Sequence, residues 1–255
     1  MSRPHALTLR VIGIGPGGPR QLTLEAVDAI AATDVFVLLD KGARVDDLAA
    51  ARQALLDAHA APGHRVVVVD DPPRDRDPAD YRAEVRRWHT ARVDAIETAL
   101  REHVADGQSA AFLVWGDPAL YDSTLRIVDQ LAERDALTLD VAVIPGVTSA
   151  SALTAAHRMV AHGIGEPILI TTGRRLAQTP PGADLNQIVM LDSHLAFAET
   201  ASDDDEVFWG AYLGTEHQLL RGGRVGDVAA EIAQVREQAR AEHGWIMDIY
   251  LLRRA

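Results

Sequence analysis

A glycine-rich segment at residues 13–18, with the sequence GIGPGG, could hold a small molecule against bare main chain. Glycines allow a sharp turn and leave room for a ligand close to the backbone. The segment satisfies the pattern G-x-G-x-x-G, and Asp40 lies about where a dinucleotide-binding fold places the acid that binds its ribose. Pro16 weakens that interpretation, because it lacks an N–H group that could bind a pyrophosphate. A tight strand-to-helix turn without a ligand is the other interpretation.

Two further segments combine small residues with turn-forming residues. One is WGDPALYDS at residues 115–123, in which Gly116 permits close approach of a ligand. Asp117 could also cap a helix there, with Pro118 in the first helical position, so a capping turn without a ligand explains the segment too. The other is IPGVTSA at residues 144–150, where a Pro-Gly turn precedes small hydroxyl residues at a predicted helix start.

Acid–base chemistry is possible at Asp40 and Lys41, the second of which is the chain's only lysine. A carboxylate at this point could act as a general base, and the ammonium could stabilise an oxyanion or bind a carboxylate. A solvated turn at the end of a strand is the alternative. The histidines do not indicate a metal site, because His157 and His162 are five residues apart and no H-E-x-x-H pattern occurs.

Several arginines could bind carboxylates through their planar guanidinium groups. Arg44 and Arg52 follow Lys41, and a basic stretch lies further along the chain at Arg74, Arg76, Arg82, Arg86 and Arg87. Arginines on an exposed helix face are the alternative interpretation of each.

The elements that must position these residues are predicted from alternating β-branched runs and helical stretches. Strands are expected at residues 7–12, 35–39, 65–69, 110–114 and 138–144, with helices at 21–32, 45–58, 78–103 and 119–133. Each strand–helix–strand unit spans about 30 residues, which is the length that a parallel crossover needs. The three small-residue turns therefore follow parallel strands and should open onto one edge of a sheet.

The second half is predicted to be a smaller, mixed α/β sheet. We expect a helix at 148–159, strands at 167–171, 188–191, 207–213 and 245–252, and a helix at 226–239. The fold class is therefore α/β with two α/β domains, at residues 1–145 with a five-stranded parallel sheet and at 146–255 with a mixed sheet.

Composition narrows the classes of partner. The net charge of −12 disfavours nucleic acid and anionic membranes as partners. The absence of cysteine excludes disulfides and thiolate ligands. No apolar run approaches the length of a membrane span or a secretory signal, so we expect a cytoplasmic protein.

Together the three turn segments resemble the motifs of the tetrapyrrole methylase family, namely a Gly-x-Gly-Pro-Gly turn, a Gly-Asp-Pro loop and a Pro-Gly-Val-Thr-Ser segment. The resemblance runs from Val11 to about Leu252. It implies an active site in a cleft between two α/β domains, a homodimer, a small-molecule tetrapyrrole substrate, and S-adenosylmethionine as methyl donor with S-adenosylhomocysteine as product. Residues 39–42, 115–123 and 212–216 most resemble the branch that methylates carbon 1 of precorrin-5 and releases acetate, in aerobic cobalamin biosynthesis. Trp115 stands where many relatives have glycine.

The resemblance also implies roles for individual residues, and no metal. The cofactor-binding set is Pro16, Gly116, Asp117, Pro118, Leu120, Tyr121, Thr148, Ser149, Ala150, Met190, Tyr212 and Leu213. The substrate-binding set is Gly15, Gly17, Lys41 and Arg44. As our own hypothesis, the catalytic set is Asp40, Lys41 and Tyr121, with Asp40 as base for the deacetylation and Lys41 as donor or carboxylate anchor.

Other functions stay open at this point. The chain could be another member of the family, such as a different precorrin methyltransferase, a diphthine synthase or a ribosomal RNA 2′-O-methyltransferase, although the acidic balance argues against RNA. From other classes, an NAD(P)-dependent oxidoreductase using residues 13–18 and Asp40, or a ligand carrier without catalysis, would also use these turns.

Overall fold

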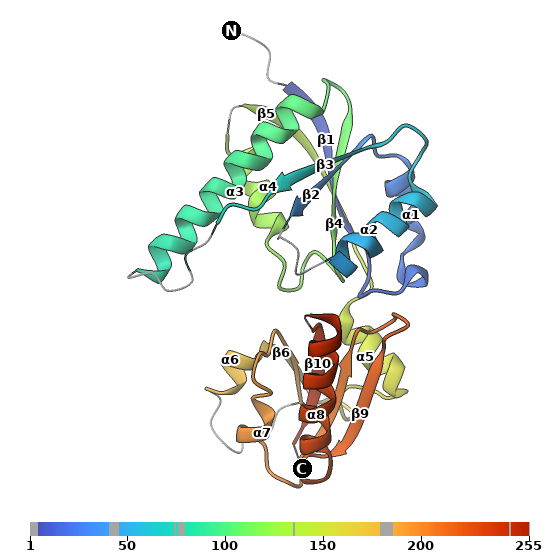
Figure 1. The fold of residues 1–255 in the computed structure, drawn as a ribbon, viewed down its shortest axis with the longest axis vertical. Helices are drawn as coiled ribbons and strands as arrows, with labels where there is room; N and C mark the ends of the chain where they lie inside the picture. The colour runs from blue at the N-terminus through green and yellow to red at the C-terminus, as the bar shows by residue number, and fades with distance from the viewer. Residues whose placement is uncertain are drawn as a thin grey trace. The chain divides into compact units, whose positions relative to one another are not determined.

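The computed structural model describes residues 5–40, 46–73, 75, 80–134, 136–178, 186–244 and 246–254. The chain forms two compact units (Figure 1). The first contains the chain up to Gly15 together with Pro19–Val147, and the second contains Thr148–Ala255 together with Pro16–Gly18.

The first unit is built on a five-stranded sheet in the order β3-β2-β4-β1-β5. All its strand pairs are parallel, which confirms the predicted parallel sheet. Every residue of β4 is buried, as expected for the centre of a parallel sheet covered on both faces. The strands are β1 (His5–Gly13), β2 (Val35–Asp40), β3 (Arg65–Asp70), β4 (Ser109–Val114) and β5 (Leu137–Ile144).

Helices cover both faces of this sheet (Figure 1). On β4, Ala110 and Phe112 belong to the core shared with α3 and α4, whereas Ala111 and Leu113 belong to the core shared with α1 and α2. This alternation follows from the two-residue period of a strand. The helices are α1 (Leu24–Ala31), α2 (Asp46–His59), α3 (Tyr81–His103) and α4 (Thr124–Ala132), and a short 3-10 turn spans Pro19–Gln21.

Some helices begin later than predicted, and two of these follow the glycine-rich turn and the loop after β4. The helix expected from residue 21 begins at Leu24, because the Thr23 hydroxyl accepts a hydrogen bond from the Ala26 N–H at 3.0 Å and caps it there. The helix expected from residue 119 begins at Thr124. Asp117 therefore does not cap it, and the prediction of a cap at Asp117 with Pro118 in the first helical position was wrong.

The second unit contains a five-stranded sheet in the order β6-β7-β10-β8-β9. Only β6 and β7 pair in parallel and the other pairs are antiparallel, which confirms the predicted mixed sheet. The strands are β6 (Ile168–Thr172), β7 (Asn186–Met190), β8 (Glu206–Ala211), β9 (Leu219–Arg224) and β10 (Asp248–Arg253). The helices are α5 (Ser149–His157), α6 (Gly173–Leu176), α7 (Phe197–Thr200) and α8 (Val225–His243).

The two long helices of this unit pack on opposite faces of its sheet. Ile249 and Leu251 of β10 share a core with Leu153 of α5, and Tyr250 shares a core with Ile232 of α8. Strand β9 was not predicted, because its sequence LLRGGR contains two glycines, which weaken a strand signal. Within the described ranges, none of the helices combines the length and the apolar character that a bilayer crossing needs.

Candidate active site

The glycine-rich turn after β1 is joined to the loop after β4 by a two-way backbone bridge. The Gly15 N–H donates to the Gly116 carbonyl at 3.2 Å, and the Gly116 N–H donates to the Gly15 carbonyl at 2.8 Å. Both residues have left-handed backbone conformations, with φ of 75° and 66°, which glycine adopts without steric cost. The glycines therefore turn the two strand ends toward each other.

The turn after β5 packs into the same place. A methyl group on Gly13 would lie 2.6 Å from the Gly146 nitrogen, so only glycine allows these backbones to approach so closely. The carboxylate of Asp117 links the two loops, because its Oδ2 accepts a hydrogen bond from the Gly146 N–H at 2.9 Å and its Oδ1 accepts one from the Ala119 N–H at 2.8 Å. The structure thus brings together the ends of β1, β4 and β5, as the sequence predicted.

In the loop at 116–121, some residues hold the shape of the loop through these hydrogen bonds, and others leave their side chains exposed. The backbone groups of Gly116 and both carboxylate oxygens of Asp117 hold the loop in shape, and Pro118 is buried. Tyr121 is 46% exposed and has a left-handed φ of 53°, and Leu120 beside it is half-buried. Such a conformation costs energy in a non-glycine residue and is concentrated at functional sites. Leu120 and Tyr121 are therefore the two large side chains of this loop that are not fully buried.

Strand order argues against a dinucleotide site. In a dinucleotide-binding sheet the order is 3-2-1-4-5-6, so the glycine-rich turn and the ribose-binding acid follow neighbouring strands. Here β4 lies between β1 and β2, which separates the turn after β1 from Asp40 at the end of β2. The N–H groups of Ile14 and Gly15 are also engaged, by Val114 and Gly116. The oxidoreductase alternative was therefore wrong.

The predicted acid–base pair is described only in part. Asp40 is exposed at the end of β2, and its carbonyl accepts a hydrogen bond from the Asp71 N–H at 3.0 Å. Lys41 and Arg44 lie outside the described residues, as do Arg74, Arg76 and the side chain of Arg82. Their roles stay predictions.

Of the basic stretch, Arg86 and Arg87 are described and exposed. Arg87 donates from Nε to Oε2 of Glu84 at 2.7 Å, and this hydrogen bond raises the pKa of the Arg87 guanidinium. Arg87 therefore already has a carboxylate partner on its own helix.

A buried ion pair at the same sheet edge was not predicted. Arg92, on α3, is only 4% exposed and donates from Nε to Oδ1 of Asp71 at 2.8 Å, with a second bond to Oδ2. Its guanidinium lies 3.9 Å from the ring centroid of Trp88, and its Nη1 donates to the Ser123 hydroxyl at 3.5 Å. The pair thus joins the residue after β3 to the start of α4. Arg92 falls midway between the apolar positions Trp88 and Ile96 of one helix face, and that spacing was the signal for its burial.

In the second unit, three predicted cofactor-binding residues share one core. Ala150 from the start of α5, Met190 from the end of β7 and Leu213 from the loop after β8 pack in the same apolar cluster. The Thr148 hydroxyl caps α5 by accepting a hydrogen bond from the Ser151 N–H at 3.0 Å, and Ser149 is half-buried. The small residue and the two apolar residues thus converge from three separate elements.

The strands β7 and β8 both end in left-handed residues, Leu191 with φ 53° and Tyr212 with φ 49°. Tyr212 donates its N–H to the Met247 carbonyl at 3.0 Å, and its carbonyl accepts a hydrogen bond from the Thr215 hydroxyl at 2.7 Å. Its backbone groups are therefore engaged within the unit. Leu191, by contrast, is 68% exposed.

A buried carboxylate fixes the chain directly after Leu191. Asp192 accepts hydrogen bonds from the Tyr250 hydroxyl at 2.6 Å and from the N–H groups of Ala196 at 2.7 Å and His194 at 2.9 Å. Burial and the hydrogen bond to Asp192 raise the pKa of Tyr250 far above its ordinary value. The phenol therefore stays protonated and keeps donating to Asp192, which holds the turn that carries Leu191.

The comparison with family models decides the family. Residues 8–229 match the model of the tetrapyrrole (corrin/porphyrin) methylases, which is most of the chain and includes the three turns described above. The chain belongs to the tetrapyrrole methylase family. It is therefore a methyltransferase that uses S-adenosylmethionine.

Relatives within the tetrapyrrole methylases differ in how much of the chain they match. A precorrin-6A synthase [deacetylating] from Sinorhizobium sp is 40% identical over 96% of this chain and 94% of its own length. A precorrin-2 C(20)-methyltransferase from Sinorhizobium sp is 32% identical over 55% of this chain and 54% of its own length. The crystal structure of a cobalamin synthesis related protein (CobF) from Corynebacterium diphtheriae has 44% identity and a TM-score of 0.85, covering 97% of this chain and 98% of that one.

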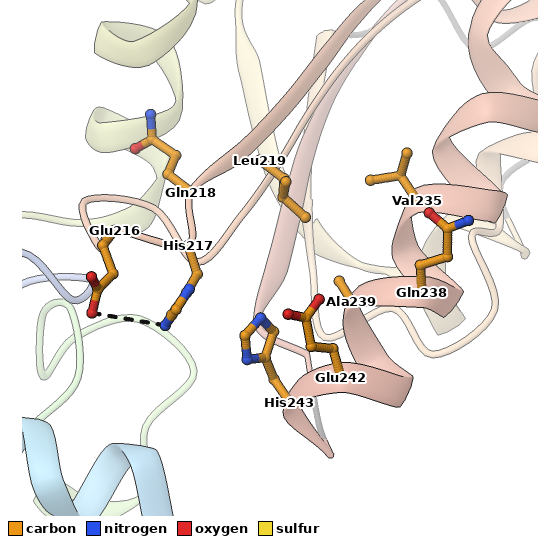
Figure 2. A pocket seen from close by; sticks show the side chains of 9 residues that line it. All are labelled: Glu216, His217, Gln218, Leu219, Val235, Gln238, Ala239, Glu242 and His243. Carbon is orange, nitrogen blue, oxygen red and sulfur yellow. Dashed lines mark ion pairs between the residues drawn. The ribbon is translucent and has the colours of Figure 1, made fainter.

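The second unit of this tetrapyrrole methylase also contains a pocket of about 270 Å³ between the loop before β9 and the end of α8 (Figure 2). The rings of His217 and His243, which line it, are tilted by 42° to each other with centroids 4.5 Å apart, and Oε1 of Glu216 lies 3.9 Å from Nε2 of His217. None of the predicted site residues lines it. Among the described residues no group of three or more histidine, aspartate or glutamate side chains could hold a metal ion.

Proposed function

We propose that this chain methylates carbon 1 of precorrin-5 and releases acetate, giving precorrin-6A in cobalamin biosynthesis. The observation that carries the proposal is the 40% identity to a precorrin-6A synthase, which extends over 96% of this chain. The precorrin-2 C(20)-methyltransferase matches only 55% of it. A biosynthetic enzyme of this kind is expected in the cytoplasm.

The residues at the described loops suit a sulfonium cofactor. S-adenosylmethionine supplies a methyl group bound to positively charged sulfur. In the first unit we expect Leu120 and Tyr121 to contact it. In the second unit we expect contacts from the apolar cluster of Ala150, Met190 and Leu213. We propose that the other predicted contacts, at Pro16, Pro118, Thr148 and Ser149, also bind the cofactor.

The engagement of Asp117 supports this assignment. Both its carboxylate oxygens accept backbone N–H groups, so the loop does not turn a free carboxylate toward the ligand. A carboxylate held tightly against the sulfonium would stabilise the ground state more than the transition state, in which the positive charge is dispersed. The methyl transfer then depends mainly on holding the ring carbon, the methyl group and the sulfur in line.

Deacetylation needs a base and a donor. We propose that Asp40 takes a proton from water, whose oxygen attacks the acetyl carbonyl carbon. The bond between that carbon and the ring breaks, acetate leaves, and the electron pair remains on the ring carbon, which forms the new bond to the methyl group. Lys41 would stabilise the negative charge that develops on the acetyl oxygen. The exposure of Asp40 at the end of β2 is compatible with access for water.

We also propose that the protein is a homodimer. The edge strand β6 exposes the consecutive apolar residues Ile168, Leu169 and Ile170, and the preceding segment exposes Val160 and Ile164. An apolar edge strand is prone to pair with another chain, and proteins normally cover such edges. The family resemblance suggests that a second copy of this chain covers this edge.

Light scattering should give twice the mass of 27.5 kDa, and Leu169→Asp should shift the mass toward one chain.

The experiment that tests the reaction is anaerobic incubation of the protein with precorrin-5 and S-adenosylmethionine carrying a ¹³C-labelled methyl group. The expected product has gained the labelled methyl and lost an acetyl group, with acetate detected by NMR in equal amount. Methylation without acetate would assign the chain to a different reaction of the family. No methylation of any precorrin would overturn the proposal.

A further inference from the structure

An arginine occupies an apolar position on helix α2. Arg52 lies three and four residues before Leu55 and Leu56, whose side chains are buried against the first sheet. Residues at these spacings share one face of a helix. The guanidinium of Arg52 is therefore on the sheet-facing side of α2, where a helix of this kind ordinarily places an apolar side chain.

One nitrogen of this guanidinium has no hydrogen-bond partner in the part of the chain that the structure describes. The Arg52 Nε is buried without a hydrogen-bond partner, and the acidic residue whose charge acts on the group is Asp122. Its nearest aromatic neighbour is Trp115, whose ring centroid lies 5.6 Å from the guanidinium carbon, and the indole Nε1 of Trp115 is also buried without a partner. Two hydrogen-bond donors from adjacent side chains are thus unsatisfied.

The surrounding charge does not compensate for this burial. Burial lowers the pKa of Arg52, and the negative charge of Asp122 opposes the change only in part. The Asp122 carboxylate itself accepts a hydrogen bond from the Thr124 N–H at 2.6 Å, at the start of α4. A partly buried charge and a buried N–H without hydrogen-bond partners both destabilise a fold, so these two side chains are suited to bind an anion.

The position of Trp115 connects this pair to the candidate active site. Trp115 directly precedes Gly116, whose backbone bridges to Gly15 of the glycine-rich turn. The two donors therefore lie beside the loop that we expect to contact the reactants.

We propose that Arg52 and Trp115 form a carboxylate-binding subsite, and that its ligand is a peripheral carboxylate of the tetrapyrrole substrate. This inference rests on the proposed function. A guanidinium binds a carboxylate through two parallel N–H bonds, and the indole N–H adds a third donor. The methionine part of the cofactor carries the same chemical group, so the test compares both ligands.

The test uses the variants Arg52→Gln, Arg52→Met and Trp115→Phe, with Arg126→Gln as the matched control because Arg126 is an exposed arginine on α4. Loss of the guanidinium should raise the KM for precorrin-5 by about tenfold or more, and loss of the indole N–H by several-fold. Calorimetry should give a Kd for S-adenosylhomocysteine within about twofold of wild type. Arg126→Gln should match wild type in both measurements.

Thermal unfolding separates binding from a structural role. Replacing a partly buried charge that lacks a hydrogen-bonded partner by an apolar side chain of similar length is neutral or stabilising, so Arg52→Met should keep or raise the Tm. A lowered Tm with unchanged KM would overturn the subsite, and so would weaker S-adenosylhomocysteine binding with unchanged KM.

If wild type turned over no precorrin, the proposed function would fail, and titration with uroporphyrin III would test the subsite by itself. In that titration, equal affinity of wild type and Arg52→Gln would overturn it.

Discussion

The main chain of Gly146 lies directly against the Gly116 carbonyl oxygen, and a methyl group on Gly146 would lie 2.0 Å from that oxygen. Asp117, the next residue in the chain after Gly116, accepts a hydrogen bond from the Gly146 N–H. The loops after β4 and β5 are therefore joined both by contact and by a hydrogen bond. We expect the two loops to move together, so a substitution that disturbs either loop should weaken ligand binding at both.

Gly146→Ala should destabilise the first unit, because the added methyl group meets backbone atoms that cannot move aside. We expect a loss of about 3 kcal/mol in the free energy of unfolding, measured by denaturant titration. Gly63→Ala is the matched control, because no atom lies within 4 Å of an added methyl group there and only the left-handed φ of 90° opposes alanine, at a cost of about 1 kcal/mol. Equal stability of the two variants would contradict the close contact.

Asp117→Ala should lower stability and weaken cofactor binding together. The substitution leaves the N–H groups of Ala119 and Gly146 without their acceptor, at a cost of about 2 kcal/mol. Calorimetry with S-adenosylhomocysteine should show weaker binding, since the loop at 116–121 loses its anchor. Asp140→Asn, at an exposed position on β5, should change neither quantity. Wild-type affinity in Asp117→Ala would mean that the loop does not depend on this carboxylate.

The turns and most elements could be predicted from the sequence because their signals are local. The five strands of the first sheet follow from short runs rich in β-branched and other apolar residues, and glycines mark the ends of β1, β4 and β5. The start of α4 could not be predicted in the same way. Asp117 and Pro118 are typical of a helix start, but the Asp117 carboxylate binds the N–H of Gly146, which is 29 residues away in the chain.

The order of the strands and the pairing of buried charges also depend on residues far apart in the chain, so local sequence signals did not predict them. A G-x-G-x-x-G turn with an acid after the second strand fits two folds, and only the insertion of β4 between β1 and β2 separates them. In the sequence, Arg92 and Arg52 both stand at helix positions whose spacing from apolar residues indicates the buried face. Whether such a charge is paired, as Arg92 is with Asp71, or keeps a nitrogen without a hydrogen-bond partner, as Arg52 does, depends on residues from other elements.

The stability of the second unit should fall at alkaline pH because of Tyr250. In the unfolded chain this phenol ionises near pH 10, whereas burial and the hydrogen bond to Asp192 keep it protonated in the folded chain. The folded state then binds one proton more than the unfolded state above pH 10, so the stability that is present below this pH is lost as the pH rises. Unfolding measured between about pH 8 and 11 should show this decline.

Tyr250→Phe should remove that contribution to the pH dependence, and at neutral pH should lose about 2 kcal/mol because the buried Asp192 loses a donor. Tyr121→Phe, at an exposed tyrosine, is the control and should keep the wild-type slope. A slope that stays the same in Tyr250→Phe would show that another group causes the decline.

Asp40→Asn should reduce acetate release much more than cofactor binding, because an amide cannot take a proton from water. We expect the rate of acetate release in a single turnover with precorrin-5 to fall by about a hundredfold or more, with the Kd for S-adenosylhomocysteine unchanged. Asp70→Asn is a close control. Asp70 pairs in register with Asp40 across β2 and β3 and is also exposed at the end of its strand. If the two variants release acetate at the same rate, Asp40 is a solvated residue at a strand end, and the base must be sought elsewhere.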